Sequence, residues 1–194
     1  HCEGFCVFND VAITIRQLQR EGRVRRAAVV DLDVHQGNGT HAVFSGDSSV
    51  FTFSMHGAHN YPFRPLPEPG SLVQGESRWG YAARVPGSLD IELPDATGDA
   101  EYLERLERAL PQVLYDSAPD IVVYLAGADP HEGDRLGRMK LTFQGLERRD
   151  VMVIQACRDV GLPVVVTIAG GYGRSIADTV AVHVATARIL AGFA

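Results

Sequence analysis

Two aspartates and a histidine stand at alternate positions in the segment DLDVHQGNGT at 31–40, namely Asp31, Asp33 and His35. The segment follows the apolar run AAVVD and leads into a glycine-rich turn. Alternate side chains of an extended segment point to the same side, so Asp33 and His35 can aim at one point. Buried negative charges are costly unless they are offset, and a divalent cation would offset them.

A third candidate ligand, Asp129, follows a different apolar run in the segment GADPHEGD. Two carboxylates and one imidazole leave one open position on a tetrahedral zinc ion, which is the pattern of a catalytic rather than a structural site. Any single aspartate at the end of a strand is more often a helix cap or a solvated group. The combination of Asp33, His35 and Asp129 favours a metal site.

The elements that must position these residues alternate along the chain. Continuous, β-branched apolar runs are typical of strands buried on both faces of a parallel sheet, and they occur at 27–31, 50–55, 120–127 and 163–171. Helical patterns lie between and around them at about 10–19, 99–116, 143–161 and 174–193, with Asn9 or Asp10 and Thr142 as candidate caps. Pro111 should kink or break the second helix.

This alternation predicts an α/β fold, a parallel sheet flanked by helices. Ligands of such sheets bind beyond the carboxyl ends of the strands. Polar residues follow all four predicted strands, since Ser54 and His56 follow the second and Tyr172 the fourth. The 194 residues fit one domain.

Composition narrows the class of protein. The net charge of −6 argues against nonspecific binding to nucleic acid or to an anionic membrane. We find no apolar run of membrane-spanning length and no opening signal peptide. The three cysteines, Cys2, Cys6 and Cys157, lack metal-finger spacing and favour reduced thiols in a cytoplasmic protein. Lys140 is the sole lysine among 18 basic residues, which we interpret as the codon bias of a GC-rich bacterial gene.

Four blocks, EGFCVFND, DLDVHQGNGT, GADPHEGDRLG and AGGYG, resemble the zinc-dependent histone deacetylase family of the arginase/deacetylase superfamily and occur in family order. The strings HQGN, NYPFR and LPDATGDAEYL look most like the class IV branch and its bacterial relatives. The resemblance runs from Glu3 to the last helix. It implies an arginase/deacetylase-like fold that lacks the family's N-terminal strands.

The resemblance also implies roles for single residues. The zinc ligands would be Asp33, His35 and Asp129, and Tyr172 would donate a hydrogen bond to the oxyanion. Phe5 and Tyr61 would line a tunnel for an acyl-lysine stem, although either could instead be plain core packing. Gly4 would leave room and a carbonyl for the substrate. Leu136 would lie at the tunnel rim, where polyamine-specific members have a glutamate, so leucine favours an acyl-lysine-like substrate.

The supporting residues are implied in the same way. Asp31 would orient a catalytic histidine. The backbone carbonyls of Asp31, Asp33, His35 and Met55, with the Ser54 hydroxyl, would resemble the family's structural potassium site. His56 could support the same region. Asn38 stands where many relatives have an aspartate. Class IV members look similar to this chain at that position, so the difference points to subclass more than to inactivity.

The chain departs from the family pattern in two further places. The family's His-His pair, which takes the proton from the attacking water and assists the leaving amine, falls before the first block and is not in this sequence. We therefore expect a C-terminal portion of a deacetylase domain, spanning 1–194, with weak or no turnover. A Pro/Gly-rich insert at about 64–87 follows Tyr61 and could form a lid or a plain loop.

Three functions stay open. The first is a zinc-dependent deacetylase acting on acetyl- or acyl-lysine in a protein or peptide, or on a small acylated amine. The second is a noncatalytic acyl-lysine binder. The third is a binuclear manganese ureohydrolase-like enzyme, which is disfavoured because its Asp-x-His-x-Asp pattern would need an acid where Gly37 stands. The oligomeric state is open.

Overall fold

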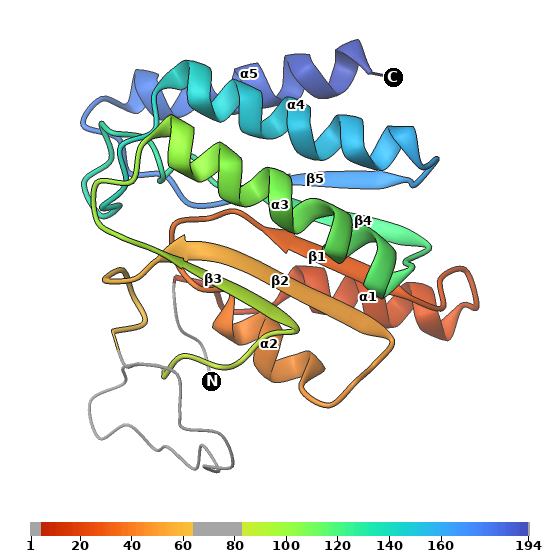
Figure 1. Ribbon diagram of the computed structural model, residues 1–194. Helices are drawn as coiled ribbons and strands as arrows, with labels where there is room; N and C mark the ends of the chain where they lie inside the picture. Colours follow the sequence, from red (N-terminus) through yellow and green to blue (C-terminus); the bar gives the residue numbers. More distant parts are fainter. Residues whose placement is uncertain (1–4, 64–82, 194) are drawn as a thin grey trace.

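A parallel β-sheet forms the centre of the computed structural model, which describes residues 5–63 and 83–193 (Figure 1). Its strands lie in the order β3-β2-β1-β4-β5, and each neighbouring pair is parallel. The strands are β1 (Ala27–Asp31), β2 (Val50–Gly57), β3 (Leu89–Leu93), β4 (Ile121–Ala126) and β5 (Val164–Ile168). The helices are α1 (Asp10–Arg20), α2 (Asn38–Phe44), α3 (Asp99–Ser117), α4 (Phe143–Asp159) and α5 (Ile176–Gly192). The predicted α/β fold is confirmed.

Helices cover both faces of the sheet. Helices α3 and α4 pack on one face with α5 beside α4, and α1 and α2 lie on the other (Figure 1). The central strand β1 serves both layers, because Ala28 and Val30 join the core under α3 and α4 while Ala27 and Val29 join the core under α1. Every residue of β1 is therefore buried, as its continuous apolar run predicts.

Local capping chemistry sets the starts of three helices. The Asn9 side chain accepts a hydrogen bond from the Ala12 amide at 2.8 Å, and Thr142 accepts one from Gly145 at 3.0 Å. Both predicted caps are thus confirmed. Ser175 caps α5 in the same way, through the Ala177 amide. Each cap satisfies a backbone donor that has no partner inside the helix.

Two elements were missed by pattern reading. The glycine-rich turn after His35 is the start of helix α2, whose N-cap is Gly37. The segment LDIEL forms β3 and pairs with β2 from Phe53↔Leu89 onward. Its residues alternate between apolar and acidic, because β3 lies at the edge of the sheet and is mostly half-buried. A search for continuous apolar runs overlooks such a strand.

The opposite edge of the sheet also differs from expectation. Strand β5 has the apolar run of a strand buried on both faces, yet its burial is only partial among the described residues. Val165 is 47% exposed and Ile168 is 70% exposed. Among the described helices, none is both long and apolar enough to cross a membrane.

The prediction that Pro111 breaks the second predicted helix is wrong. Helix α3 runs from Asp99 through Pro111 to Ser117. Proline removes the backbone donor to the Glu107 carbonyl, but residues on both sides anchor the helix. Leu106 and Leu110 before it, and Val113 after it, are all buried. Tertiary packing therefore overrides the local penalty.

We predict that Pro111→Ala stabilises the protein. Pro111 is exposed, so the change leaves the core intact and restores one helical hydrogen bond. The free energy of unfolding in denaturant titrations should rise by about 1–3 kcal/mol, which is the helix penalty of proline less its effect on the unfolded chain. The exposed neighbour Gln112→Ala should change it by less than about 0.5 kcal/mol. A lower stability of Pro111→Ala would show that the fold depends on the proline.

Candidate metal centre

The carboxyl ends of two neighbouring strands, β1 and β4, bring the candidate ligands together. β1 lies between β2 and β4, and β4 lies between β1 and β5. Asp33 and His35 follow β1, and Asp129 follows β4. In the segment after β1, Leu32 and Val34 are fully buried in the core. Alternation therefore turns Asp33 and His35 to the opposite side.

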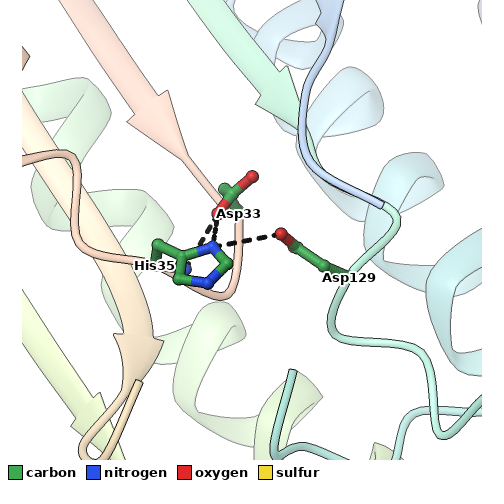
Figure 2. A group of neighbouring side chains, drawn as sticks. All are labelled: Asp33, His35 and Asp129. Atoms are coloured by element: carbon green, nitrogen blue, oxygen red, sulfur yellow. Dashed lines mark hydrogen bonds and ion pairs between the residues drawn. The ribbon is translucent and has the colours of Figure 1, made fainter. Parts of the chain in front are cut away.

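The three side chains converge on one point (Figure 2). Their candidate ligand atoms all lie within 4.8 Å of one another. His35 Nδ1 lies 2.8 Å from Asp33 Oδ1 and 3.2 Å from Asp129 Oδ2. The His35 backbone amide also donates to Asp33 Oδ1, at 2.8 Å. The sequence prediction of this grouping agrees with the geometry.

Backbone amides fix the outward oxygens of both acids. Gly170, in the loop after β5, donates to Asp33 Oδ2 at 2.8 Å. Val34 donates to Asp129 Oδ1 at 2.8 Å. Each carboxylate is therefore held from outside the group and presents its other oxygen to His35. This preorganisation is what a metal site requires of the groups around its ligands.

Two observations indicate that the group fits a metal ion. Asp129 is 1% exposed, and its Oδ2 atom has no hydrogen-bond partner despite the nearby His35 ring. A Cβ atom at Gly170 would lie 2.1 Å from Asp129 Oδ2 and 2.5 Å from Asp33 Oδ2. Glycine is thus required beside the two carboxylates. One imidazole and two carboxylates form a donor set that suits zinc and leaves a position open for water or substrate.

The electrostatics show that the site carries more negative charge than it can hold alone. Burial raises the pKa of Asp129 to about 7, and the charge of Asp33 adds to the rise against the opposing effect of His35. Burial would lower the pKa of His35, but the carboxylates of Asp129 and Asp33 beside its ring outweigh that and raise it to about 10. Burial opposes the charge on Asp33 as well, yet the bond from His35 keeps its pKa below the usual value.

Asp31 lies beneath this group, at the end of β1. It is 5% exposed, and its Oδ1 accepts a hydrogen bond from the Asp33 amide at 3.1 Å. Burial and the charge of Asp33 raise its pKa well above the usual value. Asp31 pairs in register with Ser54 of β2, whose hydroxyl accepts from the Gly37 amide at 3.3 Å. The structure thus brings Asp31 and Ser54 together, as expected.

The other predicted supporting residues lie farther along the same edge. Met55 is fully buried in the core. His56 is also fully buried, and its Nδ1 lies 3.0 Å from the Ser54 hydroxyl. Asn38 opens α2 and donates to the Ala83 carbonyl at 3.2 Å. Asn38 therefore ties α2 to the segment that precedes β3.

One aromatic ring lies beside the ligands, and two others contact each other. The Tyr61 ring lies edge-on to His35, with ring centroids 6.5 Å apart. Phe5 lies against Tyr172, with centroids 5.8 Å apart, and Tyr172 is 49% exposed. Leu136 is 45% exposed and accepts a hydrogen bond from Asn60 through its carbonyl. Gly4 and most of the predicted insert, residues 64–82, lie outside the described residues.

Asp134 is a supporting residue that sequence reasoning missed. Its Oδ2 accepts from the Tyr172 amide at 2.6 Å, and its Oδ1 accepts from the amides of Leu136 and Gly137 at 2.7 and 2.8 Å. It therefore joins the loop that carries Leu136 to the loop that carries Tyr172. Its place in GADPHEGD, beside several other acids, gave no sign of this role.

Comparison with known proteins agrees with this geometry. The histone deacetylase domain matches residues 1–187. An uncharacterised protein of Picosynechococcus sp. is 41% identical over 93% of this chain and 54% of its own length. Histone deacetylase 2 of Arabidopsis thaliana is 32% identical over 92% of this chain and 42% of its own length.

The crystal structure of an acetylpolyamine aminohydrolase from Burkholderia pseudomallei superposes with a TM-score of 0.72 at 29% identity. That match covers 98% of this chain and 50% of the other. The chain thus spans about half the length of the curated relatives it matches. With the domain match, the sheet order and the grouping of Asp33, His35 and Asp129, the chain belongs to the histone deacetylase family.

Proposed function

We propose that this chain is part of a zinc-dependent deacetylase that hydrolyses the amide of an acylated lysine or of a related acylated amine. One observation carries the proposal above all: Asp33, His35 and Asp129 converge, and the buried Asp129 Oδ2 has no hydrogen-bond partner. Family membership supports a hydrolase of acylated amines. The motifs HQGN and NYPFR support a class IV-like bacterial member, and the free thiols of Cys6 and Cys157 support a cytoplasmic location.

Each group of the site has a task in this proposal. Asp33, His35 and Asp129 hold the zinc, which when bound polarises the amide carbonyl and activates water. Tyr172 donates its hydroxyl proton in a hydrogen bond to the oxygen that becomes negative during attack. Phe5 and Tyr61 flank the acyl-lysine stem and exclude water from it. Gly4 leaves room for the stem.

The supporting residues stabilise the ligand segment. Asp31, held against the Asp33 amide, would orient a catalytic histidine. The Ser54 hydroxyl and the carbonyls of Asp31, Asp33, His35 and Met55 form the proposed potassium site, because hard cations prefer oxygen ligands. His56, bonded to Ser54, and Asn38, bonded to Ala83, hold the neighbouring backbone in place.

The residue at the proposed tunnel rim indicates the class of substrate. The acetylpolyamine aminohydrolase shares this fold, but an extended polycation would need an acidic partner near the rim position. The corresponding residue here is Leu136, an exposed apolar side chain. We therefore propose acylated lysine in a protein or peptide as the substrate.

Turnover by these 194 residues alone is proposed to be weak. The family's His-His pair is not in the sequence, and loss of general acid–base help costs about 10²–10⁴-fold in rate. The second candidate function is a noncatalytic acyl-lysine binder, which would use the same group of residues without turnover. A binuclear manganese site is disfavoured sterically, since a Cβ at Gly37 would lie 2.5 Å from Asp31 Oδ2.

Zinc content tests the ligand set. We expect one zinc ion per folded wild-type chain, and we expect Asp129→Asn to weaken zinc binding by more than about 100-fold, beyond the usual effect of outer partners. The amide keeps an oxygen for the Val34 bond but loses the charge. Metal analysis after dialysis and a chelator competition measure both quantities. Asp116→Asn, at an exposed aspartate of α3, is the control. A folded wild-type chain without zinc affinity contradicts the proposed site.

The space beside the carboxylates gives a second prediction. Gly170→Ala should abolish zinc binding, because the new methyl group would occupy the position 2.1 Å from Asp129 Oδ2. Gly192→Ala, at the end of α5 with nothing within 4 Å of its added Cβ, is the matched control. Circular dichroism establishes that both variants fold. Wild-type zinc affinity in Gly170→Ala would mean that the two carboxylates do not share one ion.

Turnover separates the two candidate functions. With an acetyl-lysine peptide, Tyr172→Phe should lower kcat by about 10²–10³-fold, the usual effect of losing one oxyanion donor. Zinc content should not change, since Tyr172 is not a proposed ligand. Hydrolysis that stops when zinc is removed supports the deacetylase. Peptide binding without hydrolysis, even by a version extended at its N-terminus to include the family's His-His pair, would favour the noncatalytic binder.

A further inference from the structure

The largest fully buried side chain of the described protein is that of Arg149, on α4. A guanidinium cannot shed its charge, so burial is costly unless its donors find partners. Its Nε donates to Asp150 Oδ1 at 2.9 Å, and Nη2 lies 2.8 Å from the same oxygen. Asp150 is itself 1% exposed.

Other elements hold this ion pair in place. The Tyr124 hydroxyl of β4 donates to Asp150 Oδ1, and the Thr186 hydroxyl of α5 donates to Asp150 Oδ2 at 2.5 Å. The carboxylate is thus fixed by two further elements. Arg149 is therefore anchored against a carboxylate that is itself fixed, and one nitrogen of the guanidinium is left to donate elsewhere.

That donor, Nη1, reaches the ends of both ligand-bearing strands. It donates to the Gly127 carbonyl at 2.6 Å and to the Leu32 carbonyl at 3.4 Å. Leu32 directly precedes Asp33, and Gly127 lies two residues before Asp129. The pairing of β1 with β4 ends at Asp31↔Leu125, so the two backbone segments are no longer paired after this point. One guanidinium spans them where pairing stops.

The two backbone segments lie unusually close to each other beyond the ends of β1 and β4. A Cβ at Gly127 would lie 2.7 Å from the Asp33 Cα atom and 2.9 Å from Asp129 Oδ1. A small shift of either carbonyl therefore moves a metal ligand. Interactions behind the ligands fix their orientation and tune the affinity of a metal site.

We propose that Arg149 is a positioning residue of the metal site, which holds Asp33 and Asp129 at their working separation by binding the Leu32 and Gly127 carbonyls. The inference rests on the proposed zinc site. Arg149 touches neither metal nor substrate. It acts only through the backbone of the two strand ends.

The test uses Arg149→Lys. Lysine keeps a cation beside Asp150 but offers one compact ammonium in place of the planar fork, so it cannot serve the carboxylate and both carbonyls together. Zinc affinity is measured by competition with a chromophoric chelator. The visible absorption spectrum of the Co²⁺-loaded protein reports ligand geometry. We expect a loss of zinc affinity of about 10–100-fold and an altered cobalt spectrum.

Arg84→Lys is the matched control. Arg84 is also buried, at 4% exposure, and donates to the carbonyls of Pro62, Gly57 and Ala58 and to Glu92. The Arg84→Lys variant should leave zinc affinity and the cobalt spectrum unchanged, even if it lowers thermal stability as much as Arg149→Lys does. Wild-type affinity and spectrum in folded Arg149→Lys would overturn the inference, and so would an equal loss in Arg84→Lys.

Two milder variants keep the test decisive if Arg149→Lys does not fold. Tyr124→Phe and Thr186→Val each remove one hydrogen bond to Asp150 and release Arg149 in part. A smaller but measurable loss of zinc affinity is expected in each, and unchanged affinity in both overturns the inference. If the folded wild-type chain binds neither zinc nor cobalt, the proposed function fails and this inference with it. Metal binding by the wild type without any change in the variants defeats the inference alone.

Discussion

The crowding of three carboxylates, with Asp31 and Asp129 buried and Asp33 half-buried, is the constraint on which the rest of the site depends. Asp31, Asp33 and Asp129 meet where two strands end, and their burial favours protons over charge. A proton on His35 offsets part of this negative charge, in line with its raised pKa. A divalent ion would offset the negative charge more fully, because metal binding displaces the protons that His35 and Asp129 would otherwise hold. The amides of Gly170 and Val34 hold two of the carboxylates in place.

The fold supplies this geometry through strand order. A parallel sheet brings the carboxyl ends of consecutive neighbours to one edge, so residues 33 and 129, far apart in sequence, become adjacent in space. Helix α4 completes the arrangement from behind, since its buried Arg149 reaches the backbone of both ligand-bearing segments. The metal group is thus supported by sheet, loop and helix together. The Tyr61 ring lies beside His35.

Sequence reasoning predicted the parts that depend on strong local patterns. Continuous β-branched runs gave the central strands, and the alternate spacing of Asp33 and His35 predicted their convergence. Strand β3 was missed because an edge strand alternates polar and apolar residues, and α2 because a short helix that opens on Asn-Gly has weak propensity. The break predicted at Pro111 does not occur, because the packing of α3 outweighs one lost hydrogen bond. The sequence does contain a signal for Arg149. One face of α4 carries Leu146, Arg149, Asp150 and Val153, so two charged residues occupy core positions there.

X-ray absorption at the zinc edge of the loaded protein tests the central claim most directly. The account predicts nitrogen and oxygen neighbours only, at about 2.0–2.2 Å, with the outer scattering of a single imidazole. That pattern corresponds to His35 with Asp33 and Asp129, plus one exchangeable oxygen. A sulfur neighbour at about 2.3 Å, or the scattering of two or more imidazoles, would contradict the account, because the ion would then be held by other residues.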